Sequence, residues 1–89
     1  MDDTQKRDII NRLKRIEGQV KGVQRMIEED KCCADVLDQM AAARAALYNA
    51  GVLLLERHAR GCVMEAISEG EEGEAIDELV HVIKKFARS

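Results

Sequence analysis

A long helical pattern in the middle of the chain limits its possible folds more than any other feature. From about Ala34 to Arg60, apolar side chains recur at the three- and four-residue spacing of one helix face. This stripe consists of Val36, Leu37, Met40, Ala43, Leu47, Ala50, Leu54 and Leu55. At ~1.5 Å per residue such a helix is about 40 Å long. A chain of 89 residues cannot cover that length in one globule, so we expect a second chain to bury much of it.

Two shorter helical patterns flank the long one. The first carries the apolar stripe Ile9, Leu13, Ile16, Val20, Val23 and Ile27. Thr4 is its expected N-cap, and its end is expected near residues 29–30. The long helix is expected to stop, or only to weaken, at Gly61. A loop over residues 68–73 then precedes a short helix with the apolar face Ile76, Leu79, Val80, Ile83 and Phe86. With no proline and 2% aromatic residues, the composition favours helices over sheets. We predict an all-α protomer of three helices, forming one domain over residues 1–89.

The net charge of −3 conceals a strong asymmetry. Residues 6–25 contain seven basic and two acidic side chains, a balance of +5, whereas the rest of the chain has a balance of −8. The basic side chains are Lys6, Arg7, Arg12, Lys14, Arg15, Lys21 and Arg25. A solvated helix face can look the same, but a basic segment on an acidic body indicates a polyanionic partner such as nucleic acid. The sequence has no helix-turn-helix signature, so it does not indicate which groove of the DNA the protein would contact.

The three cysteines point to chemistry in a reducing compartment. The first residues lack the apolar core of a signal peptide, and no stretch approaches the ~18 apolar residues of a membrane span. We therefore expect a cytoplasmic protein without a membrane partner. In that compartment, cysteines are more often metal ligands or redox centres than structural crosslinks.

Cys33, His58 and Cys62 form the candidate metal site. His58 and Cys62 are four residues apart, so a helix places them one turn apart on one face. Cys33 precedes His58 by 25 residues, roughly 37 Å along a straight helix. An antiparallel second copy would bring its Cys33 to the His58 end of the first, giving two equivalent sites. Two thiolates and one imidazole suit Cu(I) or Zn(II). Three ligands suit trigonal Cu(I), but Cys32 could supply a fourth ligand and keeps zinc open.

Three stretches together resemble the copper-sensing repressor family, the CsoR/RcnR group of bacterial metal and stress sensors. The first stretch covers residues 11–22, with the sequence NRLKRIEGQVKG. The second, CADVL, covers residues 33–37, and the third, HARGCV, covers residues 58–63 and is followed by AIDEL at residues 75–79. The resemblance therefore spans nearly the whole chain, and its ligand spacing fits the copper branch.

The resemblance implies an antiparallel dimer with a shared four-helix core, and a tetramer made of two such dimers. It implies a repressor whose apo form binds the operator of copper-efflux genes and whose release follows Cu(I) binding. The implied ligands are Cys33 from one subunit and His58 with Cys62 from the other. Glu78 matches a glutamate that orients the ligand histidine. Arg12 matches a DNA-contacting arginine of the family. We expect further DNA contacts from other basic residues of the same segment, namely Lys14, Arg15, Lys21 and Arg25.

Cys32 departs from the family pattern and leaves other interpretations open. Many copper sensors have at this position a tyrosine that supports the histidine. A thiol there allows an altered metal preference, or a persulfide-sensing repressor that crosslinks Cys33 and Cys62, although His58 argues against the second. A copper buffer without a DNA role is a third interpretation, and the basic segment argues against it. The sequence contains neither a nucleophile–base pair nor a phosphate-cradling glycine loop. We therefore expect that the protein is not an enzyme.

Overall fold

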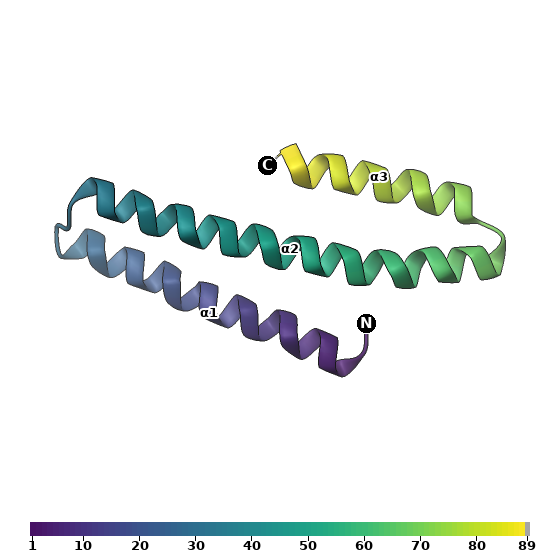
Figure 1. The fold of residues 1–89 in the computed structure, drawn as a ribbon, viewed down its shortest axis with the longest axis horizontal. Helices are drawn as coiled ribbons and strands as arrows, with labels where there is room; N and C mark the ends of the chain where they lie inside the picture. Colours follow the sequence, from purple (N-terminus) through teal and green to yellow (C-terminus); the bar gives the residue numbers. More distant parts are fainter. Residues whose placement is uncertain (89) are drawn as a thin grey trace. The chain divides into compact units, whose positions relative to one another are not determined.

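The computed structural model describes residues 1–88, which form three α-helices (Figure 1). Helix α1 spans Asp3–Glu28, α2 spans Cys33–Glu69 and α3 spans Glu72–Arg88. No strand occurs among these residues, so the predicted all-α protomer is confirmed. The chain divides into two compact units, Asp2–Leu53 and the part from Leu54 onward together with Met1. The single domain predicted over residues 1–89 stays a prediction.

Helix α1 begins with a capping box at Asp2. The Asp2 carboxylate accepts a hydrogen bond from the Gln5 backbone N–H at 2.7 Å, and the Gln5 side chain accepts one from the Asp2 N–H at 3.2 Å. The predicted N-cap at Thr4 was wrong. Thr4 has Arg7 three residues later, and an arginine has no acceptor for the returning hydrogen bond of a capping box.

The end of α1 turns sharply at Asp30, which has a φ of 57°. Two hydrogen bonds close the turn: the Lys31 N–H donates to the Met26 carbonyl at 3.0 Å, and the Asp30 N–H donates to the Ile27 carbonyl at 3.1 Å. This pair of bonds is the Schellman motif, which normally places glycine at the left-handed position. The turn leads directly into α2.

Helix α2 is longer than predicted, because it continues through Gly61 and ends at Glu69. A glycine inside a helix costs only about 1 kcal/mol relative to alanine, too little to stop a helix that good helix formers continue. The stop comes at Gly70, with a φ of 76°. The Gly70 N–H donates to the Ile67 carbonyl at 3.2 Å and the Glu71 N–H to the Ala66 carbonyl at 2.7 Å. The predicted loop over residues 68–73 therefore shrinks to the two residues between α2 and α3.

The unit Asp2–Leu53 packs α1 against the first part of α2 through residues spaced by seven. The buried side chains are Ile9, Ile16 and Val23 on α1, and Val36, Ala43 and Ala50 on α2. Seven-residue spacing is the signature of a coiled-coil-like seam between helices. The other half of the predicted α1 stripe stays open, since Leu13, Val20 and Ile27 are 42%, 45% and 58% exposed.

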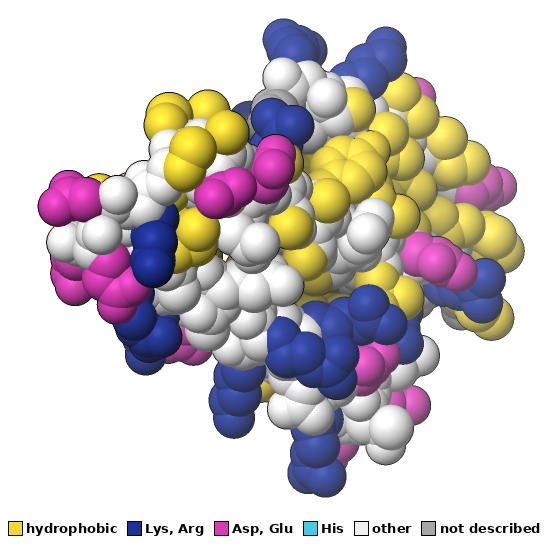
Figure 2. Space-filling view, turned by 60° about the vertical axis from the view of Figure 1, so that its left-hand side comes forward, with side chains coloured by type: hydrophobic (Ala, Val, Ile, Leu, Met, Phe, Trp, Pro, Cys, Tyr) yellow, Lys and Arg dark blue, Asp and Glu magenta, His cyan; other side chains and the backbone are white. Residues whose placement is uncertain are grey.

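The unit from Leu54 onward contains the second part of α2 and all of α3. Ala66 is its one buried hydrophobic residue within the described chain, and α3 buries none of its side chains. On α3, Ile76, Val80 and Ile83 are between 42% and 47% exposed. Figure 2 shows hydrophobic side chains gathered at the molecular surface. None of the helices formed by residues 1–88 is both long and apolar enough to cross a bilayer.

Candidate metal centre and basic helix

The His58 and Cys62 side chains meet on one face of α2. The Cys62 Sγ lies 3.2 Å from the His58 Nε2, and both side chains are exposed. The tautomer of His58 decides which of the two atoms donates the hydrogen bond. Metal bonds of about 2.3 Å to sulfur and about 2.0 Å to nitrogen span this separation, so one ion can contact both atoms. A thiolate sulfur with an imidazole nitrogen is a soft donor pair.

Cys33 is the first residue of α2, and Cys32 immediately precedes the helix. The Cys32 carbonyl accepts the first hydrogen bond of the helix, from the Val36 N–H at 3.0 Å. Both thiols are free and exposed, as is the thiol of Cys62. Within the described part of a single chain, no group of three His, Cys, Asp or Glu side chains could hold a metal ion. The structure thus brings together two of the three predicted ligands.

Glu78 lies on α3 with its side chain exposed. No hydrogen bond joins it to His58 among residues 1–88. Its predicted role in orienting the imidazole stays a prediction.

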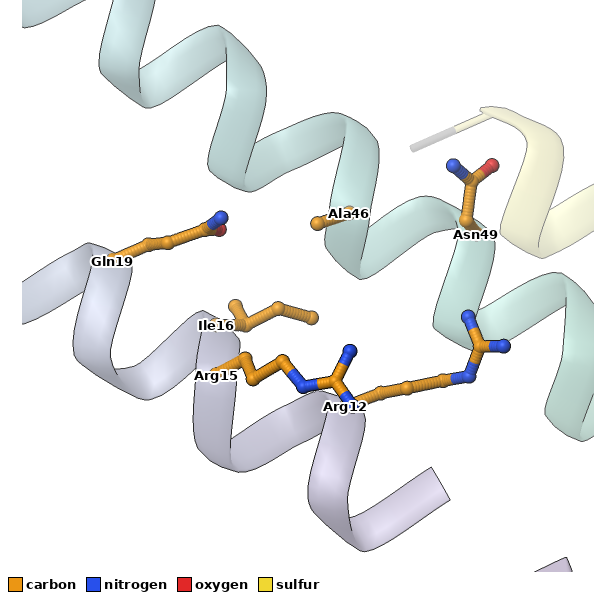
Figure 3. A pocket seen from close by; sticks show the side chains of 6 residues that line it. All are labelled: Arg12, Arg15, Ile16, Gln19, Ala46 and Asn49. Carbon is orange, nitrogen blue, oxygen red and sulfur yellow. The ribbon is translucent and has the colours of Figure 1, made fainter. Parts of the chain in front are cut away.

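The five predicted DNA-binding side chains fall on two sides of α1. Arg12 and Arg15 line a cavity of about 240 Å³ between α1 and α2 (Figure 3). At about 100° per residue, Lys14, Lys21 and Arg25 lie roughly 180–220° around the helix from Arg12. Lys21 is paired there with Glu17, with 3.9 Å between Nζ and Oε1. The basic segment therefore presents two surfaces, and only one of them faces α2.

Gln19 and Asn49 also line this cavity, and neither was predicted as a functional residue. Gln19 could have been found from helix spacing, because it follows Arg12 by seven residues and Arg15 by four. Asn49 could not, since its neighbours on α1 depend on how the two helices pack.

A sequence profile of metal-sensitive transcriptional repressors matches residues 5–85. The chain belongs to this family. The prediction of a metal-sensing repressor is thereby confirmed. The match runs from the capping box of α1 almost to the end of α3, and so includes every predicted site residue.

Individual members of the metal-sensitive repressor family are similar over most of their length. The copper-sensing transcriptional repressor CsoR of Bacillus subtilis is 52% identical over 85 residues, which are 96% of this chain and 84% of that protein. The copper-sensing transcriptional repressor RicR of Mycobacterium tuberculosis is 49% identical over 69 residues, covering 78% and 72% of the two chains.

The solved structures of two metal-responsive regulators share the fold. The copper-sensing repressor CsoR with Cu(I) from Geobacillus thermodenitrificans superposes with a TM-score of 0.89 at 49% identity, covering 98% of this chain and 91% of that one. The nickel-responsive transcriptional regulator InrS superposes with a TM-score of 0.80 at 38% identity, covering 90% of each chain.

Proposed function

We propose that this chain is a Cu(I)-responsive transcriptional repressor. Its apo form binds operator DNA of copper-efflux genes, and Cu(I) binding to Cys33, His58 and Cys62 releases the DNA. The observation that carries the proposal is the soft donor pair of Cys62 and His58, 3.2 Å apart, in a chain similar to copper-sensing repressors. A DNA-binding role in a bacterial cell implies the cytoplasm, where thiols stay reduced.

The site is shared between two chains. Cys33 opens α2, and His58 follows 25 residues later in the same helix. A helix of that length spans roughly 37 Å, far beyond the reach of one coordination sphere. An antiparallel second copy supplies the missing thiolate, and two-fold symmetry then makes two identical sites.

An apolar groove in the unit Asp2–Leu53 supports this dimer. The groove has a volume of about 280 Å³ and is lined by Ile16, Val20, Val23, Met40, Ala43, Arg44 and Leu47. Val20, Met40 and Leu47 are each about half exposed, although fully burying such a side chain is worth about 1.5–3 kcal/mol. A second copy that covers the groove completes a four-helix core, and two dimers then form the tetramer that the family resemblance implies.

Copper is favoured over zinc by the number of ligands. Cys33, His58 and Cys62 make a three-coordinate set that suits Cu(I), whereas structural zinc takes four ligands. Cys32 is the one nearby thiol that could complete a zinc site. X-ray absorption on the loaded protein distinguishes the two: two sulfurs and one nitrogen support the proposal, and a third sulfur contradicts it.

The function is tested by fluorescence anisotropy with duplexes tiled across the DNA upstream of the gene for this chain. Apo protein is expected to bind at least one duplex, and one Cu(I) per protomer should weaken that binding about 5- to 150-fold. Linkage requires that the DNA weaken Cu(I) binding by the same factor. Unchanged DNA affinity in protein shown to hold copper would overturn the proposal.

Persulfide sensing is the second candidate, because all three thiols are free and exposed. One cysteine thiolate would attack the outer sulfur of a small-molecule persulfide and release that molecule's thiolate, leaving a cysteine persulfide. The second cysteine thiolate would attack the inner sulfur of this persulfide and release hydrosulfide, leaving a disulfide between Cys33 of one chain and Cys62 of the other. Mass spectrometry after persulfide treatment tests it. A crosslink that releases DNA favours this signal over copper, and its absence excludes it.

A further inference from the structure

The cavity between α1 and the first part of α2 has the composition of a small anion site. Its lining comprises Arg12, Arg15, Ile16, Gln19, Ala46 and Asn49. These six residues include two guanidinium groups, two amides and no acid. Figure 3 shows Arg12, Arg15 and Gln19 on the side of α1 that faces α2, with Ala46 and Asn49 across from them.

The size of the cavity argues for a single small group. Its volume of about 240 Å³ lies below the roughly 300–1,000 Å³ of pockets that enclose a drug-sized ligand. A phosphate is small enough, and it matches the donors. Guanidinium groups bind phosphate oxygens in a bidentate manner, and side-chain amides donate further N–H groups to them.

The two arginines keep donors available for such a group. Arg12 is paired with Asp8 through Nε, with 3.6 Å between Nε and Oδ1, so the paired atom is not one of its two terminal nitrogens. Arg15 forms no ion pair in the part of the chain that the structure describes. Across the helix, Lys21 is paired in a similar way, with Glu17 at 3.9 Å, so Arg15 is the cavity cation whose charge no carboxylate among the described residues offsets.

We infer that this cavity binds a backbone phosphate of the DNA, with Arg12 and Arg15 supplying charge and Gln19 and Asn49 supplying amide donors. The inference rests on the proposed function and extends it in two ways. It assigns DNA contacts to Gln19 and Asn49, and it places the DNA on the α1 face opposite Lys14, Lys21 and Arg25. Phosphate contacts of this kind fix the position of a protein on the duplex without reading its sequence.

Charge-adding substitutions test the assignment. Gln19→Glu and Asn49→Asp each add a carboxylate to the cavity with almost no change of shape. Gln24→Glu is the matched control, because it adds the same charge to the same helix about 140° away from Gln19. Gln19, Gln24 and Asn49 are all exposed, so all three variants should keep the wild-type helix content by circular dichroism.

DNA affinity is measured by anisotropy with the same tiled duplexes over a range of salt concentrations. Gln19→Glu and Asn49→Asp should each weaken binding by about tenfold or more, while Gln24→Glu should bind like the wild type. The slope of log affinity against log salt should fall in magnitude by about 0.9 for each phosphate that the variant no longer neutralises.

The outcomes separate this inference from the function on which it rests. Wild-type affinity in both cavity variants, with DNA still released by Cu(I), overturns the inference and leaves the repressor function standing. Equal weakening in the Gln24→Glu control also overturns it, because the effect is then one of net charge. A wild-type protein that binds no duplex overturns the proposed function and this inference with it.

Discussion

The Sγ of Cys62 lies 3.2 Å from the Nε2 of His58, one turn earlier on α2. Two soft donors are thus in place before any metal arrives, which reduces the ordering that metal binding requires. In the proposed site a third donor, Cys33 of a second chain, completes the set. Sensing and assembly would then be coupled through the same few atoms.

Removing one donor of this pair should silence the sensor without disabling it as a repressor. In Cys62→Ser, apo protein should bind DNA as the wild type does, while the 5- to 150-fold weakening expected from Cu(I) should vanish. Anisotropy with and without copper measures both quantities. Cys32→Ser is the control, and it should respond to copper normally. A loss of DNA binding by apo Cys62→Ser would show that this thiol is needed for the fold or the DNA interface instead.

A shared site should be restored by mixing two inactive variants. Cys33→Ser lacks the first thiolate and Cys62→Ser lacks the other, so neither homodimer has a complete site. If subunits exchange at random, half of the dimers are mixed and each has one intact site, which gives about a quarter of the wild-type copper stoichiometry. Copper binding to the mixture, monitored by ultraviolet thiolate-to-copper absorption against each variant alone, checks this. No gain on mixing would mean that the ligands belong to one chain.

The exposed groove residues should control the oligomeric state. Leu47 is 52% exposed and lines the groove, whereas Ile10 is 49% exposed and lies outside it. Leu47→Glu should shift the protein to a smaller species, because an unpaired charge would be buried in the dimer. Ile10→Glu adds the same charge at similar exposure and should leave the assembly intact. Sedimentation velocity measures both, and an unchanged mass for Leu47→Glu would rule out the groove as the dimer interface.

The turn after α1 should be improved by glycine. Asp30 holds a φ of 57°, a region costly for residues with a Cβ, so Asp30→Gly should raise the free energy of unfolding by about 0.5–1 kcal/mol. Glu28→Gly, in the last helical turn, should lower it by up to about 1 kcal/mol. Urea denaturation at one fixed protein concentration compares them. A less stable Asp30→Gly would indicate that the Asp30 side chain contributes more than its backbone strain costs.

Periodicity predicted the three helices but not which side of each is covered. Ile16 is 8% exposed and Val20 is 45% exposed, yet both belong to one stripe in the sequence. The position of α2 decides between them, and that position is a tertiary property. The end of the long helix was similarly ambiguous: Gly61 and the predicted loop that contains Gly70 were both possible stops, and of these two glycines only Gly70 adopts a positive φ.

The candidate site was likewise predictable from the sequence only in part. The contact between His58 and Cys62 could be predicted, because four residues make one helical turn. The side of α1 that carries Arg12 and Arg15 could be derived from their spacing, but the cavity they form with Asn49 depends on helix packing. Cys33 could be added to the predicted site only by assuming a second chain, because 25 residues of helix separate it from His58.

The thin core of the single chain has a consequence for the cell. Among residues 1–88, no large side chain is less than 2% exposed, and a chain of this size has little other means of stabilising itself. In the proposed dimer, association would supply part of the folding free energy, so the melting temperature should rise with protein concentration by mass action. The rate of synthesis then sets two quantities at once: how much operator is occupied, and what fraction of the chains escapes proteolysis.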